Sequence, residues 1–124
     1  MSTGDGHWVE FPTRGGHAQT GRRPAIVVQG RVASASLPTV LLVPLTSQQD
    51  ALRFPGTVLV EPDTLHGLRR PSVALVFQMT AVDRRCIAER LGRVSETVLQ
   101  RIWSAFDVLT ERSTAGTDEQ QEEK

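Results

Sequence analysis

Short apolar runs separated by turn-forming residues follow one another through the first two thirds of the chain. The runs are rich in Val, Leu and Thr and are bounded by Gly, Pro or Ser, which is the pattern of β-strands. Their close spacing leaves no room for crossover helices, so the pattern predicts an antiparallel, strongly bent sheet or small barrel. The predicted strands are residues 7–11, 25–28, 39–44, 57–60 and 72–80.

Helical patterns occur only toward the C-terminus. Asp83 is placed to cap a short helix over residues 84–90, which Gly92 would end. Ser95 is placed to cap a longer helix that runs to about Thr110. Its apolar positions recur at helical spacing and are more typical of core packing than of a partner-binding face. This apolar stripe consists of Val98, Leu99, Ile102, Trp103, Phe106 and Leu109.

Length and charge together indicate one domain followed by an acidic tail. The chain has 124 residues, which is the size of one ordinary domain. Residues 1–112 carry 13 basic and 10 acidic side chains, whereas residues 113–124 carry 4 acidic side chains and one lysine. The formal net charge of zero therefore divides into +3 and −3. We expect the domain to end at residue 111 and residues 112–124 to be a disordered acidic tail.

Cysteine content and hydropathy indicate the compartment. Cys86 is the only cysteine, so no disulfide within the chain is expected, as is typical of a reducing cytoplasm. The sequence has no basic-then-apolar signal at its N-terminus and no apolar run approaching ~20 residues. We therefore expect a cytoplasmic protein without a membrane span.

The common catalytic and metal-binding motifs are missing from the sequence. His7, His17 and His66 are scattered, without an HExxH motif or cysteine partners, so no metal site is predicted. There is also no GxSxG elbow, no P-loop and no dinucleotide-binding glycine pattern. Candidate chemistry is confined to three other stretches.

The first stretch is the basic, glycine-rich loop FPTRGGHAQTGRRP at residues 11–24. Its glycines make it flexible, and Arg14, Arg22 and Arg23 suit a flap that covers an anion. Arg23 precedes Pro24 and is therefore biased to an extended backbone, which restrains its direction at the mouth of a strand. The alternative is that Arg23 pairs with a carboxylate at the sheet edge, and the pattern alone favours that alternative.

The other two stretches place polar side chains at or within apolar strands. LLVPLTSQQD, at residues 41–50, ends an apolar strand in Thr46, Ser47 and Gln48. Strand ends often carry function, although Ser and Thr also simply cap turns. In VALVFQMTAVDRRC, at residues 73–86, Gln78 interrupts a strand. A buried Gln either ties a structural network, which is the favoured interpretation here, or contacts a ligand.

Taken together and in this order, these stretches resemble the MazF/PemK (Kid) toxins of bacterial toxin–antitoxin modules. The resemblance covers about residues 4–110 and ends with the C-terminal helix. It rests on TGDGHWVEFP, GGHAQTGRRPAIVV, LPTVLLVPLTSQ and SVALVFQMTAVDRR. It implies a mainly β fold, an SH3-like small antiparallel barrel of the CcdB/Kid type, and a homodimer. It also implies a sequence-specific, metal-independent endoribonuclease without a cofactor, which cleaves single-stranded RNA by attack of the 2′-hydroxyl on the adjacent phosphate.

The same resemblance implies roles for individual residues. The family's catalytic arginine, directly before the proline, falls on Arg23, and its catalytic threonine falls on Thr46. A preorganised guanidinium stabilises the charge that builds up on the phosphate. It can also donate a proton to the leaving oxygen, although its high pKa makes it a reluctant acid. The expected RNA-binding residues are Arg14, His17, Gln19, Arg22, Ser47, Gln48 and Gln78. The expected partner is a cognate MazE-like antitoxin, through which alone DNA would be contacted.

One departure from the family pattern keeps other functions open. Family loops commonly read Ser-Glu-Gln where this chain has His17, Ala18 and Gln19. Either His17 takes over as proton acceptor or catalysis is weaker. One alternative is a non-enzymatic inhibitor like the CcdB toxins, which poison DNA gyrase on the same fold. Another is a degenerate module that only binds its antitoxin or represses its own operon.

Overall fold

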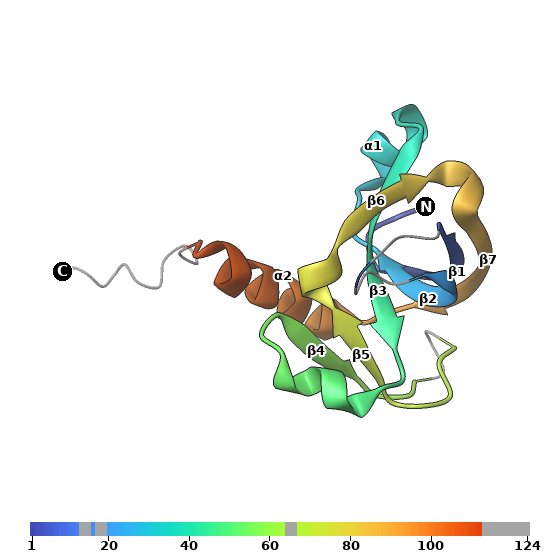
Figure 1. Ribbon diagram of the computed structural model, residues 1–124. Coiled ribbons are helices and arrows are strands. Elements are labelled where there is room, and N and C mark those ends of the chain that lie inside the picture. The colour runs from blue at the N-terminus through green and yellow to red at the C-terminus, as the bar shows by residue number, and fades with distance from the viewer. Residues whose placement is uncertain (13–15, 17–19, 64–66, 113–124) are drawn as a thin grey trace.

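Antiparallel pairing joins the strands of the described residues, 1–12, 16, 20–63 and 67–112, in this computed structural model (Figure 1). The order across the sheet is β4-β5-β3-β2-β1-β7, and β6 also pairs with β3. The strands are β1 (Asp5–Phe11), β2 (Gly21–Val27), β3 (Thr39–Thr46), β4 (Thr57–Val60), β5 (Ser72–Leu75), β6 (Thr80–Asp83) and β7 (Ile87–Arg93). The helices are α1 (Arg31–Ser36) and α2 (Glu96–Thr110), with short 3₁₀ turns η1 (Gln49–Arg53), η2 (Val76–Gln78) and η3 (Arg84–Cys86).

The predicted fold class, a mainly antiparallel β protein with a C-terminal helix, is confirmed. The predicted strands 7–11, 39–44 and 57–60 fall within β1, β3 and β4. The predicted strand 25–28 overlaps β2, which begins earlier, at Gly21. Two further predictions, strand 72–80 and helix 84–90, are corrected below.

Strand β3 is the centre of the fold, because it pairs with three other strands. One edge pairs with β2, and the other pairs with β6 along its first half and with β5 at its end. Leu45 lies opposite Ala74, but Leu42 lies opposite Thr80, three residues further than a continuous ladder would give. The turn η2 takes up these extra residues. The predicted single strand 72–80 is therefore two strands with a 3₁₀ turn between them.

The predicted helix over residues 84–90 is wrong. Asp83 does cap a turn, since its carboxylate accepts a hydrogen bond from the Arg85 backbone N–H at 2.8 Å, but this turn is only η3. The following residues form β7, which pairs with β1 through Val9 opposite Ile87 and Gly6 opposite Gly92. The free edge of β1 offers a row of main-chain hydrogen-bond groups, and pairing with it outweighs the local helical pattern.

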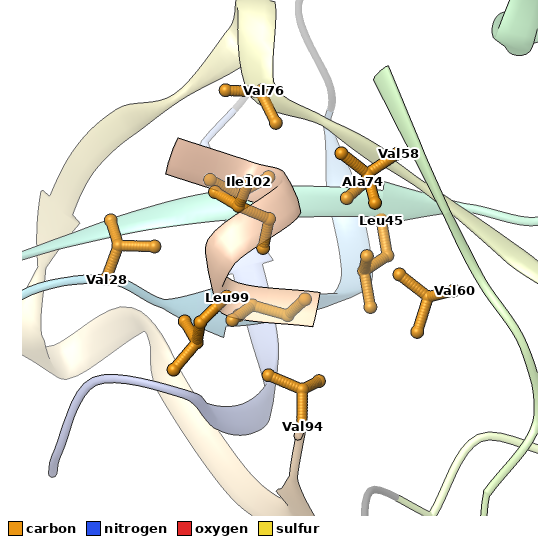
Figure 2. Packing of buried hydrophobic residues seen from close by; sticks show 11 residues of the cluster. Val28, Leu45, Val58, Val60, Ala74, Val76, Val94, Leu99 and Ile102 are labelled. Atoms are coloured by element: carbon orange, nitrogen blue, oxygen red, sulfur yellow. The ribbon is translucent and has the colours of Figure 1, made fainter. Parts of the chain in front are cut away.

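The predicted helix from Ser95 to about Thr110 is confirmed as α2. Ser95 Oγ accepts a hydrogen bond from the Val98 backbone N–H at 3.2 Å, which caps the first turn. Leu99 and Ile102 are buried and lie among side chains of the strands in Figure 2. The other four residues of the stripe are partly buried against the same cluster. The apolar face of α2 therefore serves the core, as its spacing predicted.

Buried Gln29 explains a short helix that the sequence pattern did not predict. Its Nε2 donates to the Thr39 carbonyl at 3.0 Å and to Ser34 Oγ at 3.2 Å, and its Oε1 accepts from the Leu41 backbone N–H at 3.1 Å. This side chain therefore ties α1 to the start of β3. The element has only six residues and no apolar period of its own, so tertiary contacts stabilise it, including hydrogen bonds from the Arg84 guanidinium to the Ser34 and Leu37 carbonyls.

Two further sequence predictions concern the C-terminus and membranes. Of the predicted acidic tail, residues 112–124, residues 113–124 lie outside the described residues, so the domain boundary at residue 111 stays a prediction. Within the described part of the chain, neither helix is long and apolar enough to span a bilayer.

Candidate active site

The register of the central strands brings Arg23 and Thr46 to the same end of the sheet. β2 and β3 pair antiparallel, with Ala25 opposite Pro44. Continued by two residues, this register places Arg23 level with Thr46. Both residues line one groove of about 630 Å³, although they are 23 positions apart in the chain. The sheet therefore delivers the two predicted catalytic residues to one site.

The groove is strongly basic. The charged residues that line it among the described residues are all arginines, Arg22, Arg23, Arg69 and Arg70. Its remaining walls come from Trp8, Pro24, Leu45, Thr46, Ser47, Gly67, Leu68, Ser72 and Leu91. A concave site lined by arginines concentrates anions and suits a polyanionic ligand.

Thr46 is held in place at the end of β3. It is 9% exposed, and its Oγ1 accepts a hydrogen bond from the Gln48 backbone N–H at 3.2 Å. Because this bond uses a lone pair, the hydroxyl hydrogen of Thr46 is left to be donated. Ser47 is exposed and lines the same groove. Thr46 can therefore act as a positioned donor toward an anion.

Arg22 and Arg23 are neighbours in the chain with different surroundings. The Arg22 Nη2 donates to Glu89 Oε1 and Oε2 at 2.9 Å each, and its Nη1 lies 3.4 Å from Glu10 Oε2. Its guanidinium also lies 5.0 Å from the ring centroid of Trp8, in a cation–π contact. The hydrogen bonds with Glu89 raise the pKa of Arg22 further above its ordinary value. Arg22 is thus a charged arginine at the rim of the groove, paired with two carboxylates.

Arg23, by contrast, forms no ion pair with any of the described residues. Its one hydrogen bond among them runs from Nε to the Thr20 carbonyl at 3.3 Å, which leaves both Nη groups for another acceptor. The sequence pattern alone favoured a carboxylate partner for Arg23. Within the described chain that interpretation holds for Arg22 instead, which Glu10 faces across the β1–β2 ladder.

Arg69 and Arg70 are groove residues that the sequence analysis missed. Both are exposed, and neither forms an ion pair or hydrogen bond with another described residue through its side chain. A signal for them does exist in the sequence. The tripeptide Arg-Arg-Pro at residues 69–71 directly precedes the strand at residues 72–75. The same tripeptide occurs at residues 22–24.

A second hollow, of about 660 Å³, adjoins the basic groove and shares Thr46 with it. Its apolar wall contains Phe54 and Phe77, whose ring centroids are 5.6 Å apart and which are 43% and 39% exposed. Gln48 and Gln78 line the same hollow, and Arg53 stacks on Phe54 at 4.6 Å. Flat apolar surface next to amide groups suits a nucleobase.

The predicted RNA-binding residues thus divide between the two hollows. Arg22 and Ser47 line the basic groove, whereas Gln48 and Gln78 line the aromatic hollow. Arg14, His17 and Gln19 lie outside the described residues.

Comparison with known proteins identifies the class. A family model described as PemK-like, MazF-like toxin of type II toxin-antitoxin system matches residues 3–110. The chain therefore belongs to this family, and the resemblance drawn from the four sequence segments is confirmed.

Individual relatives agree with this assignment. The endoribonuclease MazF of Staphylococcus saprophyticus is 25% identical over 108 residues, which cover 87% of this chain and 89% of the relative. The crystal structure of MazF from Deinococcus radiodurans matches with a TM-score of 0.76 at 26% identity, over 90% of this chain and 96% of that one. A MazE–MazF structure from the same organism matches with a TM-score of 0.72 at 27% identity, over 91% and 97%. The fold is therefore MazF-like.

Proposed function

We propose that this protein is an endoribonuclease toxin that cleaves single-stranded RNA at specific sequences without a metal ion. The observation that carries the proposal is that Arg23, without a carboxylate partner among the described residues, shares one basic groove with Thr46. The relatedness to MazF endoribonucleases over most of the chain supports it.

The reaction we propose needs charge stabilisation more than acid–base side chains. The 2′-oxygen attacks the adjacent phosphorus, the bond to O5′ breaks, and the products are a 2′,3′-cyclic phosphate and a 5′-hydroxyl. The guanidinium of Arg23 stabilises the extra negative charge on the five-coordinate phosphorus, and Thr46 donates its hydroxyl hydrogen to a phosphate oxygen. Since a guanidinium is a poor acid, water protonates O5′.

Acceptance of the 2′-hydroxyl proton is assigned to His17, as the residue of the loop whose ordinary pKa lies near neutrality. It takes the place of the glutamate that family loops commonly carry one position further on. This role predicts a cleavage rate that falls as the pH is lowered, and it predicts that His17→Ala loses that pH dependence.

We further propose that the aromatic hollow holds a base next to the cleaved bond. Phe54 and Phe77 offer ring faces for stacking, and the amides of Gln48 and Gln78 are placed to contact base edges. The aromatic hollow and the basic groove share Thr46 and therefore adjoin each other. One RNA strand can thus place a base in the hollow and the neighbouring phosphate in the groove.

The partners we propose are a second copy of the chain, as a homodimer, and an acidic antitoxin segment. The antitoxin segment folds on binding and lays carboxylates over the arginines of the groove, so that it blocks RNA. The MazE–MazF structure of the Deinococcus relative supports a partner of this kind. The tail from Ser113 onward is proposed to be dispensable for cleavage.

The deciding experiment is incubation of the purified protein with a long, weakly structured RNA in excess EDTA, followed by mapping of the ends. We expect discrete cuts that leave 2′,3′-cyclic phosphates. Gyrase inhibition without RNA cleavage would instead identify a CcdB-like inhibitor. Antitoxin or operator binding without cleavage would identify a degenerate module.

A further inference from the structure

The tripeptide Arg-Arg-Pro occurs twice in this chain, each time at the entrance to an apolar strand. The first copy, residues 22–24, lies in β2, and the second, residues 69–71, directly precedes β5. β2 and β5 pair with opposite edges of β3. Both run antiparallel to β3, so each begins where β3 ends, in Thr46.

The two copies therefore lie on either side of Thr46. On one side, the β2–β3 register places Arg23 level with Thr46. On the other side, Val73 lies opposite Thr46, and the second copy lies just beyond the end of β3. Two strand spacings, about 10 Å, separate β2 from β5. A ligand that crosses the end of β3 would therefore meet the two copies at different points along its length.

The backbone at the second copy is fixed by two side chains from nearby elements. Ser72, which is buried, donates its hydroxyl to the Arg70 carbonyl at 3.3 Å. Gln49 of η1 donates its Nε2 to the Pro71 carbonyl at 3.1 Å. In addition, Arg70 precedes Pro71, which restricts its backbone to an extended form, as Pro24 does for Arg23. Arg70 is thus presented to the groove from a restrained position.

The two arginines of the second copy differ from Arg22 in their ion pairing. Arg69 and Arg70 form no ion pair with a described residue, whereas Arg22 of the first copy is paired with Glu10 and Glu89. Arg69 also lines a neighbouring hollow with Asp63, whereas Arg70 lines the basic groove and not that hollow. Two exposed cations that form no ion pair with a described residue, in a groove whose described lining has no acidic residue, suit an anionic ligand.

We propose that Arg69 and Arg70 form a second phosphate-binding site, which holds a phosphodiester next to the scissile one on the RNA strand. The inference rests on the proposed function. It assigns different work to the two copies of Arg-Arg-Pro. Arg23 acts on the phosphate that reacts, whereas Arg70 binds one that does not and sets the register of the strand in the groove.

The test measures binding of a short RNA that carries the mapped cleavage site and a 2′-deoxy substitution that blocks attack. Arg69→Ala and Arg70→Ala are compared with Arg31→Ala and Arg101→Ala, which remove exposed arginines of α1 and α2 outside the groove. The slope of log K against log salt is negative, and we expect each groove variant to reduce its magnitude by about 0.7, the contribution of one single-strand phosphate contact. The control variants leave the slope unchanged.

A phosphate scan identifies which phosphate is bound. Single phosphates of the same RNA are replaced by neutral methylphosphonates. We expect one flanking position to weaken wild-type binding several-fold and to have no further effect in Arg70→Ala. In single-turnover cleavage, Arg70→Ala raises the RNA concentration needed for the half-maximal rate several-fold, because the lost contact contributes to binding of the strand. Arg70→Lys keeps the salt slope but not the full affinity, since an ammonium lacks the planar fork.

Several results would overturn the inference. One is a salt slope of Arg69→Ala and Arg70→Ala that equals that of Arg101→Ala while the wild type still cleaves RNA. Another is coupling of Arg70 to the scissile phosphate itself. A third is weaker binding of an acidic antitoxin peptide with unchanged RNA binding, which would assign the site to that protein. If the wild type neither binds nor cleaves RNA, the proposed function fails as well.

Discussion

Two clusters of arginines in this fold differ in what faces them. At the edge of the sheet, Arg90 and Arg93 of β7 lie against Asp5 of β1, whose carboxylate is 3.3 and 3.4 Å from their guanidiniums. At the end of the sheet, Arg23, Arg69 and Arg70 line a groove without a carboxylate partner among the described residues. The residue type is the same, and the partner differs.

The Asp5 cluster is structural. The Asp5 side chain is only 11% exposed and also accepts a hydrogen bond from the Ser2 backbone N–H at 3.0 Å. Burial alone raises the pKa of Asp5, but the hydrogen bonds from Ser2 and Arg90 and the charges of Arg90 and Arg93 outweigh it and hold the pKa below its ordinary value. Arginines with a fixed carboxylate stabilise the fold, whereas arginines without one are available to a ligand.

The largest effect on this comparison is expected from Arg23→Ala. Loss of one preorganised donor lowers the single-turnover cleavage rate by about 100-fold or more, while thermal stability stays unchanged because the side chain is exposed. Arg23→Lys does not restore full activity, because an ammonium lacks the planar fork of a guanidinium. The measurement uses a short RNA with the mapped cleavage site. An unchanged rate for Arg23→Ala would remove the proposed role of this residue.

Thr46→Ala is expected to have a smaller effect, about tenfold on the same rate, since it removes one hydrogen bond from an uncharged donor to the phosphate. The double variant Arg23→Ala, Thr46→Ala should lose less than the product of the two single losses, because the residues act on one phosphate as a unit. Thr110→Ala is the matched control, because it removes an exposed threonine hydroxyl of α2 that does not line the groove. Independent, multiplying losses would argue against a shared phosphate.

The sequence pattern predicted elements better than it predicted neighbours. The strand that ends in Thr46 and the helix capped by Ser95 follow from local signals, namely an apolar run and a cap with an apolar stripe. The wrongly predicted helix over residues 84–90 had local signals too, but residues of this segment pair with the open edge of β1 and form β7. Pairing between distant segments is not encoded in a local period.

The candidate site shows the same limit. Arg23 and Thr46 were assigned from the family resemblance, and their convergence depends on the register of β2 against β3. Arg70 went unnoticed because only the pairing of β5 with the far edge of β3 brings it to the groove. The repeated Arg-Arg-Pro is visible in the sequence, but without the strand order nothing relates its two copies to one site.

Substitution of Asp5 tests the structural half of the comparison. Asp5→Asn should lower the free energy of unfolding by about 1–2 kcal/mol at neutral pH, the range for charged hydrogen bonds reduced because both arginines are half exposed. Because the folded pKa lies below the ordinary 3.8, this stabilisation is complete above that value and is lost as the pH falls through the folded pKa. Urea unfolding of both proteins from neutral to acid pH measures it.

The cleavage rate of Asp5→Asn should remain within about twofold of wild type under conditions where the variant is folded. Asp5 neither lines the groove nor touches an arginine that does. A stability difference that stayed constant down to the lowest pH would contradict the assigned role of its charge.

The smallest effects are expected at Arg22, which combines both kinds of surroundings because it lines the groove and is paired with Glu89. Arg22→Ala should weaken RNA binding only about two- to fivefold and in a salt-dependent way, since the substitution also removes the partner of two carboxylates.

Glu89→Gln should tighten RNA binding by a similar factor, because it removes a carboxylate charge that faces Arg22 without moving the strand. Arg22 holds the pKa of Glu89 below its ordinary value, so the carboxylate stays charged at any pH suited to the assay. Glu61→Gln is the control, an exposed carboxylate that does not line the groove. If Glu89→Gln bound RNA no more tightly than Glu61→Gln, pairing with a fixed carboxylate would not explain why some arginines of this fold are structural and others are available to a ligand.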